Sequence, residues 1–136
     1  MALEAILGKK YKLASSEKFD EYMKAVGVGL VTRKVGNAVS PVVELRKEGD
    51  EYVLSSSSTF KNTVTKFKPG VELDDVTPDG RPVKATFTVE GNTLKEVQKG
   101  ADGKVTTIDR IWTDDEVKTV LTLGDIVCTR IYKLQA

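Results

Sequence analysis

Two arginines and one tyrosine near the C-terminus carry the strongest chemical signal in this sequence. Arg130 and Tyr132 lie two residues apart in the segment VCTRIYKL, and Arg110 lies twenty residues before Arg130. The segment alternates β-branched and aromatic residues with others, which is typical of a strand. Its more apolar face also carries Arg130, and an arginine is almost never buried without a partner. The pattern therefore predicts a guanidinium group that faces the interior and needs an anion.

The turns between the last three strands place both arginines on one face of the sheet. If Gly124-Asp125 and Asp114-Asp115 are two-residue loops, Thr119 pairs with Arg110 on one side and with Arg130 on the other. The two guanidinium groups then lie at about two strand spacings, or ~10 Å. A loop longer by one residue would move the side chains to the opposite face.

The strand predicted over residues 93–99 adds polar groups to the same interior. Its lysines occupy one face, so Glu96 and Gln98 on the other are expected to point inward. Either arginine could pair with Glu96 in a structural salt bridge, but one carboxylate cannot neutralise two guanidinium groups. The alternative is a barrel that holds water and a ligand with an anionic head and an apolar tail, because arginine suits a carboxylate.

The composition excludes several classes of protein. The 136 residues include no histidine, so a Ser-His-Asp triad and a histidine-ligated metal site are impossible. A net charge of +1 argues against nucleic acid as the main partner. Neither a signal peptide nor a membrane span is predicted. We therefore expect a cytoplasmic protein that is not an enzyme and has no metal or cofactor. We also expect it to be a monomer.

The elements that position these residues are mostly strands. Apart from one longer gap, turn signals follow one another at roughly 10–12-residue spacing from residue 50 onward, which is typical of an antiparallel meander. The prediction is an all-β single domain over residues 1–136, either a sandwich or a barrel.

One segment between the first two strands has a helical period instead. Ser16 is the predicted N-cap of a helix that ends at Gly27, and residues 28–35 are predicted to form a second helix, ended by Gly36-Asn37. Pro41 is then expected to begin the next strand. The apolar stripe of this segment fits either a plug that fills one end of the core or a lid over an opening. The stripe consists of Phe19, Met23 and Val26.

These residues resemble the intracellular fatty-acid-binding protein family, most closely its heart/muscle and adipocyte branch. The stretches that carry the resemblance, which covers essentially the whole chain, are KFDEYMKAVGVGLVTRKVGNAVSP, STFKNTVTKFK, DGRPVK and VCTRIYK. The resemblance implies a ten-stranded antiparallel up-and-down barrel, lipocalin-like, with a helix-turn-helix lid between the first and second strands. It also implies a water-filled cavity that carries long-chain fatty acids through the cytosol.

The resemblance assigns roles to particular residues. It implies that Arg130 and Tyr132 contact the fatty-acid carboxylate directly and that Arg110 acts through water. Thr119 stands where the family usually has an aliphatic residue, which would change the placement of the fatty-acid tail and the ligand preference. The positions that match its lid and portal, the latter near Pro78-Asp79-Gly80, are Phe19, Tyr22, Val28, Phe60 and Lys61.

Other interpretations stay open within the same fold. Retinoic acid is also a hydrophobic carboxylate, so a retinoid carrier is one alternative, and a lipid-dependent regulatory interaction protein is another. Lys24, Arg33 and Lys34 match lid positions that form a nuclear-localisation patch in some relatives; they also fit a solvated helix face, or contact with anionic membranes. Cys128 is expected to be a small buried hydrophobe, although Arg130 nearby would lower its pKa and favour modification.

Overall fold

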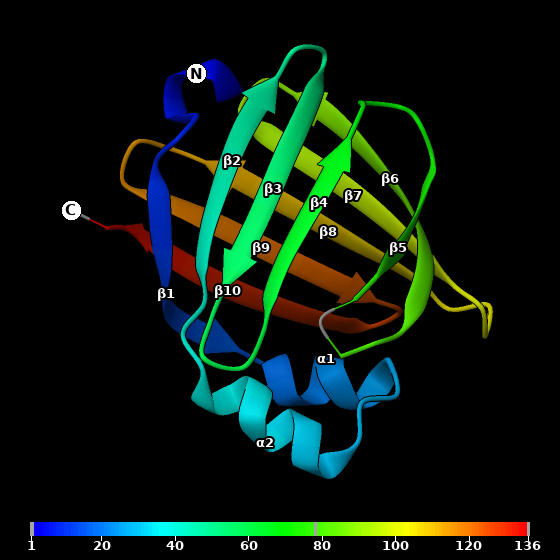
Figure 1. Ribbon diagram of the computed structural model, residues 1–136. Coiled ribbons are helices and arrows are strands. Elements are labelled where there is room, and N and C mark those ends of the chain that lie inside the picture. Colours follow the sequence, from blue (N-terminus) through cyan, green and yellow to red (C-terminus); the bar gives the residue numbers. More distant parts are fainter. Residues whose placement is uncertain (1, 78, 136) are drawn as a thin grey trace.

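The computed structural model describes residues 2–77 and 79–135, and Pro78 of the predicted 78–80 turn lies outside them. Ten antiparallel strands form one sheet in the order β4-β3-β2-β1-β10-β9-β8-β7-β6-β5, which curves into a nearly closed barrel (Figure 1). This confirms the predicted fold class and the barrel over the sandwich. The strands are β1 (Lys10–Glu17), β2 (Val42–Glu48), β3 (Glu51–Ser57), β4 (Asn62–Phe67), β5 (Leu73–Val76), β6 (Pro82–Glu90), β7 (Thr93–Gly100), β8 (Val105–Trp112), β9 (Glu116–Leu123) and β10 (Ile126–Leu134).

The register of β8, β9 and β10 is the one predicted from the turns. Thr119 pairs with Arg110 on β8 and with Arg130 on β10. Gly124, the first residue of the β9–β10 loop, has a φ of +57°, which glycine adopts without the steric penalty of a side chain. Both two-residue loops therefore form, and the arginine row lies on the inner face.

The first helix of the lid, α1 (Phe19–Ala25), begins later than predicted. Ser16 is not its N-cap, because β1 continues through Ser16 and Glu17 and pairs there with β10. The N-cap is Lys18, whose φ of +61° turns the chain from strand to helix. The ladder to β10 holds Ser16 and Glu17 in extended conformation, so the helix cannot start at Ser16. The predicted end of the helix is correct, since Val26 is its C-cap and Gly27 follows.

The second helix, α2 (Leu30–Ala38), continues through the glycine that was predicted to end it. Gly36 packs against α1 instead, because a Cβ atom there would lie 3.0 Å from the Sδ atom of Met23. The absence of a side chain thus allows the two helices to approach each other. The helix also begins two residues later than predicted, and β2 begins one residue after Pro41.

Arg33 connects the two helices rather than facing solvent. Its side chain is only 15% exposed, and its Nε atom lies 3.2 Å from Oδ1 of Asp20 on α1. Its Nη1 atom donates a hydrogen bond of 2.8 Å to the carbonyl of Val28, between the helices. Of the three cations in the predicted lid patch, Lys24 and Lys34 are therefore the exposed ones.

The two ends of the barrel are closed differently (Figure 1). The lid helices cover one end, and a short 3-10 helix, η1 (Leu3–Ile6), lies at the other. Leu3 and Ile6 of η1 belong to the larger of two apolar clusters, which also holds Trp112. The smaller cluster lies under the lid and consists of Tyr22, Met23, Val26, Val28 and Cys128, with Phe19, Leu121, Leu123 and Ile126 packed against it. None of the helices in the described ranges is long and apolar enough to cross a membrane.

Candidate functional site

A cavity of about 250 Å³ lies inside the barrel, and both lid helices contribute to its wall. Part of the wall is apolar, including Leu54, Phe87, Ile108 and Leu121. All ten residues predicted for the site and its portal line this cavity, so the fold brings together residues from the lid, the β3–β4 turn and four strands. They are Phe19, Tyr22, Val28, Phe60, Lys61, Gln98, Arg110, Thr119, Arg130 and Tyr132.

Arg130 is a buried cation whose charge has no carboxylate partner among the residues that the structure describes. It is 7% exposed. Its Nε atom donates to Oγ of Ser16 at 3.2 Å, and its guanidinium carbon lies 3.7 Å from the centroid of the Phe19 ring. A hydroxyl and an aromatic face stabilise a cation but do not neutralise it. The arginine therefore retains both Nη groups to bind an anion from solution.

Tyr132 lies beside Arg130 on the same face of β10 and is also 7% exposed. Its ring centroid is 5.9 Å from the guanidinium carbon of Arg130. Within residues 2–77 and 79–135 its hydroxyl has no hydrogen-bond partner, although it lines the cavity. A phenol can donate one hydrogen bond, so Tyr132 adds a second donor to the wall of the cavity beside Arg130.

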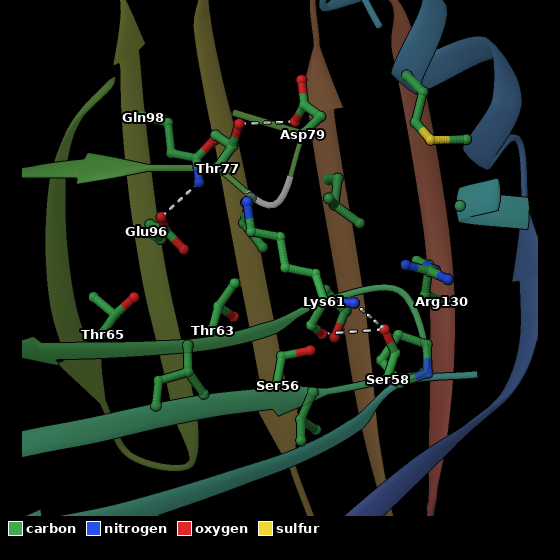
Figure 2. Close-up of a pocket in the computed structure, with 18 of the residues that line it drawn as sticks. Ser56, Ser58, Lys61, Thr63, Thr65, Thr77, Asp79, Glu96, Gln98 and Arg130 are labelled. Carbon is green, nitrogen blue, oxygen red and sulfur yellow. Dashed lines mark hydrogen bonds between the residues drawn. The ribbon is translucent and has the colours of Figure 1, made fainter. Parts of the chain in front are cut away.

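Arg110, in contrast, is already paired. Its Nη1 atom lies 2.7 Å from Oε1 of Glu96, which is 2% exposed. The other oxygen of Glu96 accepts a hydrogen bond of 2.7 Å from Nε2 of Gln98, and Figure 2 shows this pair across the cavity from Arg130. The alternative of a structural salt bridge thus holds for Arg110. It does not hold for Arg130.

The predicted portal residues lie where the wall is more open. Phe60 is 43% exposed, and Lys61 beside it is also exposed. The Oγ atom of Ser58 accepts hydrogen bonds from the backbone N–H groups of both, at 3.2 and 3.1 Å. The helix α2 has no buried residue along its length. Segments with so few buried contacts open more easily than the rest of a fold.

The sequence did not reveal two other features of the site. One is the partner of a wall residue and not itself in the wall: exposed Ser16, whose contact with Arg130 depends on β1 continuing past the predicted helix start. The other is a polar wall on and beside β3, β4 and β5, partly visible in Figure 2. The spacing of two residues between Ser56 and Ser58 and between Thr63 and Thr65 is the signal that could have identified it. It consists of Ser55, Ser56, Ser58, Thr63, Thr65, Asp75 and Thr77.

A second ion pair lines the cavity near the turn before β6. Nε of Arg81 lies 2.6 Å from Oδ2 of Asp79, and the hydroxyl of Thr77 donates to Asp79 at 2.7 Å. Burial by itself would raise the pKa of Asp79, but these hydrogen bonds and the charge of Arg81 outweigh it and hold the pKa below its usual value. Asp79 therefore remains a carboxylate, and Arg81 is neutralised.

Cys128 behaves as a buried hydrophobe and not as a reactive thiol. It lies under the lid with no exposed surface. Burial raises the pKa of its thiol to about 11, and the opposing charge of Arg130 does not offset this. The alternative of a lowered pKa is therefore wrong, because desolvation of the thiolate exceeds the attraction of the neighbouring cation.

Native Cys128 is expected to react with iodoacetamide at pH 8 about 100-fold more slowly than the same thiol in urea. The reason is that its pKa rises from 9.0 to about 11, which lowers the thiolate fraction. The rate should climb with pH until the pH reaches the raised pKa. Mass spectrometry gives the rate directly, since this is the only cysteine of the chain. Equal rates in the native and unfolded protein would show that the lid does not protect the thiol.

Comparison with known proteins identifies the family. Residues 7–135 match the lipocalin / cytosolic fatty-acid binding protein family. The chain belongs to this family.

In the described part of the chain, no group of three His, Cys, Asp or Glu side chains is placed to hold a metal ion.

Three relatives within the family are informative. The fatty-acid-binding protein from brain tissue of Drosophila melanogaster is 56% identical, and its structure superposes with a TM-score of 0.89 over 94% of this chain and 98% of the other. A fatty acid binding protein of Schistosoma mansoni, solved in complex with arachidonic acid, is 36% identical, with a TM-score of 0.94 and full coverage of both chains. Sodium/calcium exchanger regulatory protein 1 of the squid Doryteuthis pealeii is 44% identical over 131 residues, which cover 96% of this chain and 98% of the squid protein.

Proposed function

We propose that this protein binds long-chain fatty acids one at a time inside its barrel and carries them through the cytoplasm as a single-domain monomer, without catalysing a reaction. The observation that carries the proposal is Arg130, a buried guanidinium with no carboxylate partner in the described chain, beside a cavity that is partly apolar. The Schistosoma relative with arachidonic acid bound supports it, because that ligand is a fatty acid.

In this proposal the carboxylate lies against Arg130 and Tyr132. The free Nη groups of Arg130 and the hydroxyl of Tyr132 form charge-assisted hydrogen bonds with it. Arg110 acts on the carboxylate only through water, since the ion pair with Glu96 already neutralises its charge. The tail then extends along the apolar wall toward the lid and the portal at Phe60 and Lys61.

Native mass spectrometry of the protein purified from its own source tests the proposed function. We expect one bound long-chain fatty acid per chain, and titration of the delipidated protein with palmitate should give a stoichiometry of one. Titration with all-trans retinoic acid distinguishes the retinoid alternative, because that ligand is also a carboxylate but has a rigid, bulky tail. A bound retinoid, or no binding of palmitate, would contradict the proposal.

A regulatory role is the second candidate function, favoured by the name of the squid relative. Such a role would require a surface that changes when lipid binds, and α2 offers the exposed residues Leu30 and Val31.

Nuclear import through the lid patch would require Arg33 to leave Asp20. Transfer rates to anionic and to neutral vesicles separate a carrier that delivers lipid at membranes from a passive buffer, since Lys24 and Lys34 favour anionic surfaces.

Phe60→Ala is expected to speed both association and release of palmitate by on the order of tenfold, which corresponds to a barrier lowered by about 1.4 kcal/mol. The equilibrium constant should change less than either rate, because a gate is crossed in both directions. Stopped-flow binding and release, compared with equilibrium titration, measure this. Val64→Ala is the matched control, since Val64 is 62% exposed and does not line the cavity. A large loss of affinity with an unchanged association rate would instead make Phe60 part of the binding wall.

A further inference from the structure

The charged side chains that line the cavity are unevenly balanced. Four are cations and three are carboxylates. Two of the cations are neutralised in ion pairs: Arg110 with Glu96, and Arg81 with Asp79. Asp75 lies at the β4–β5 edge, where it accepts a hydrogen bond from Thr65 at 3.3 Å. The remaining cations are Lys61 at the exposed β3–β4 turn and the buried Arg130. Among the lining residues that the structure describes, Arg130 is therefore the deep cation left for a ligand.

The Glu96 side chain is held firmly in the position from which it forms the ion pair with Arg110. It lies on β7 opposite Ile108 of β8, and Arg110 lies two residues further along β8, so the two side chains are diagonal neighbours. Both oxygens of Glu96 are engaged, one by Arg110 and one by Gln98, each at 2.7 Å. At 2% exposure, Glu96 cannot turn toward bulk solvent without opening the barrel. The pair is a fixed part of the wall.

We infer that Glu96 determines how strongly the cavity prefers an anionic head group over a neutral one, by neutralising Arg110 and leaving Arg130 to bind the anion. This inference rests on the proposed function. The row Arg110–Thr119–Arg130 spans two strand spacings, about 10 Å. At that distance a second uncompensated guanidinium would attract the bound carboxylate through the low-dielectric interior. With Glu96 present, single-chain lipids with a neutral hydroxyl head compete better than they would in a cavity with two free arginines.

The test compares Glu96→Gln with the native protein, using palmitate and hexadecanol as the anionic and neutral probes. Glutamine keeps the size and hydrogen-bonding groups of the side chain and removes its charge. We expect the ratio of palmitate to hexadecanol affinity to rise on the order of tenfold, as Coulomb's law gives at ~10 Å with an effective dielectric constant of 20. Hexadecanol affinity itself should change by less than about twofold, because a neutral head gains little from the freed charge.

Glu116→Gln is the matched control, because it makes the same change in net charge outside the cavity. Glu116 pairs with exposed Lys133 at 2.6 Å and does not line the wall. Its palmitate-to-hexadecanol ratio should equal that of the native protein. A ratio that stays unchanged in Glu96→Gln, or that rises equally in Glu116→Gln, would overturn the inference.

Arg110→Gln gives an independent result. Alone it leaves Glu96 as an unpaired carboxylate near the ligand, so palmitate affinity should fall at least tenfold, and adding Glu96→Gln should restore most of it. If the double variant stays as weak as Arg110→Gln, Arg110 binds the carboxylate directly and the inference is wrong. Thermal melts check that each variant folds, and if Arg110→Gln does not, the Glu96→Gln ratio decides. Failure of the native protein to bind palmitate would contradict the proposed function instead.

Discussion

Arg130→Ala is expected to weaken palmitate binding by about 1.5–3 kcal/mol, the usual loss for a hydrogen bond to a charged group. This corresponds to roughly 10- to 150-fold in affinity. The reason is that Arg130 is the buried cation of the cavity without a carboxylate partner in the described chain. Isothermal titration of the delipidated variant measures the loss.

The same substitution should leave the ligand-free protein at least as stable as before. A buried cation without a counter-ion is unfavourable, and its removal relieves that desolvation. Arg46→Ala is the control, because Arg46 is an exposed arginine of β2 that does not line the cavity. Thermal melts of both variants without lipid test the stability. Unchanged palmitate affinity in Arg130→Ala would place the carboxylate elsewhere and remove the main support for the proposed site.

Affinity is expected to rise steadily from octanoate toward stearate, and this effect should exceed that of the head group. Each buried methylene contributes up to about 0.8 kcal/mol, so ten additional ones give a gross gain of about 8 kcal/mol. Ordering of the tail takes back part of this gain. The polar wall near Ser56 and Thr63 lowers it further, since methylenes beside hydroxyl groups and water lose less contact with solvent. The rise should level off when the cavity is full.

The chain-length series also tests whether head and tail act independently. In Arg130→Ala the slope per methylene should equal that of the native protein, with a constant offset from the lost head-group contact, because distant contributions usually add. Competition with a fluorescent fatty acid allows all chain lengths to be compared under one set of conditions. Affinity that does not depend on chain length would contradict an apolar-tail site, whatever the offset.

The strand register and the inward face of the site follow from local features of the sequence. A side-chain period of two residues fixes which residues share a face, and the glycine of the β9–β10 loop fixes where the pairing begins. For this reason the amino-acid sequence alone is enough to place Arg110, Thr119 and Arg130 in one row. The lack of histidine equally excluded whole classes of chemistry from composition alone.

The boundaries of the lid depended on contacts that the local sequence does not contain. Ser16 has the side chain of an N-cap, but its backbone pairs with β10, over a hundred residues away, and therefore stays extended. Gly36 has the features of a helix end, but its role is close packing against Met23. In both cases a tertiary partner outweighs a local preference.

The electrostatics of the cavity were decided by the tertiary structure as well. The sequence showed two arginines and one inward carboxylate but left open which arginine would pair. The diagonal geometry between β7 and β8 brings Glu96 within 2.7 Å of Arg110, while Arg130 lies a further two strands away. The raised pKa of Cys128 has the same origin, because desolvation arises only when the lid and the barrel close over the thiol. Local periodicity determines which side chains point inward, but charge pairing and burial depend on distances that exist only in the closed barrel.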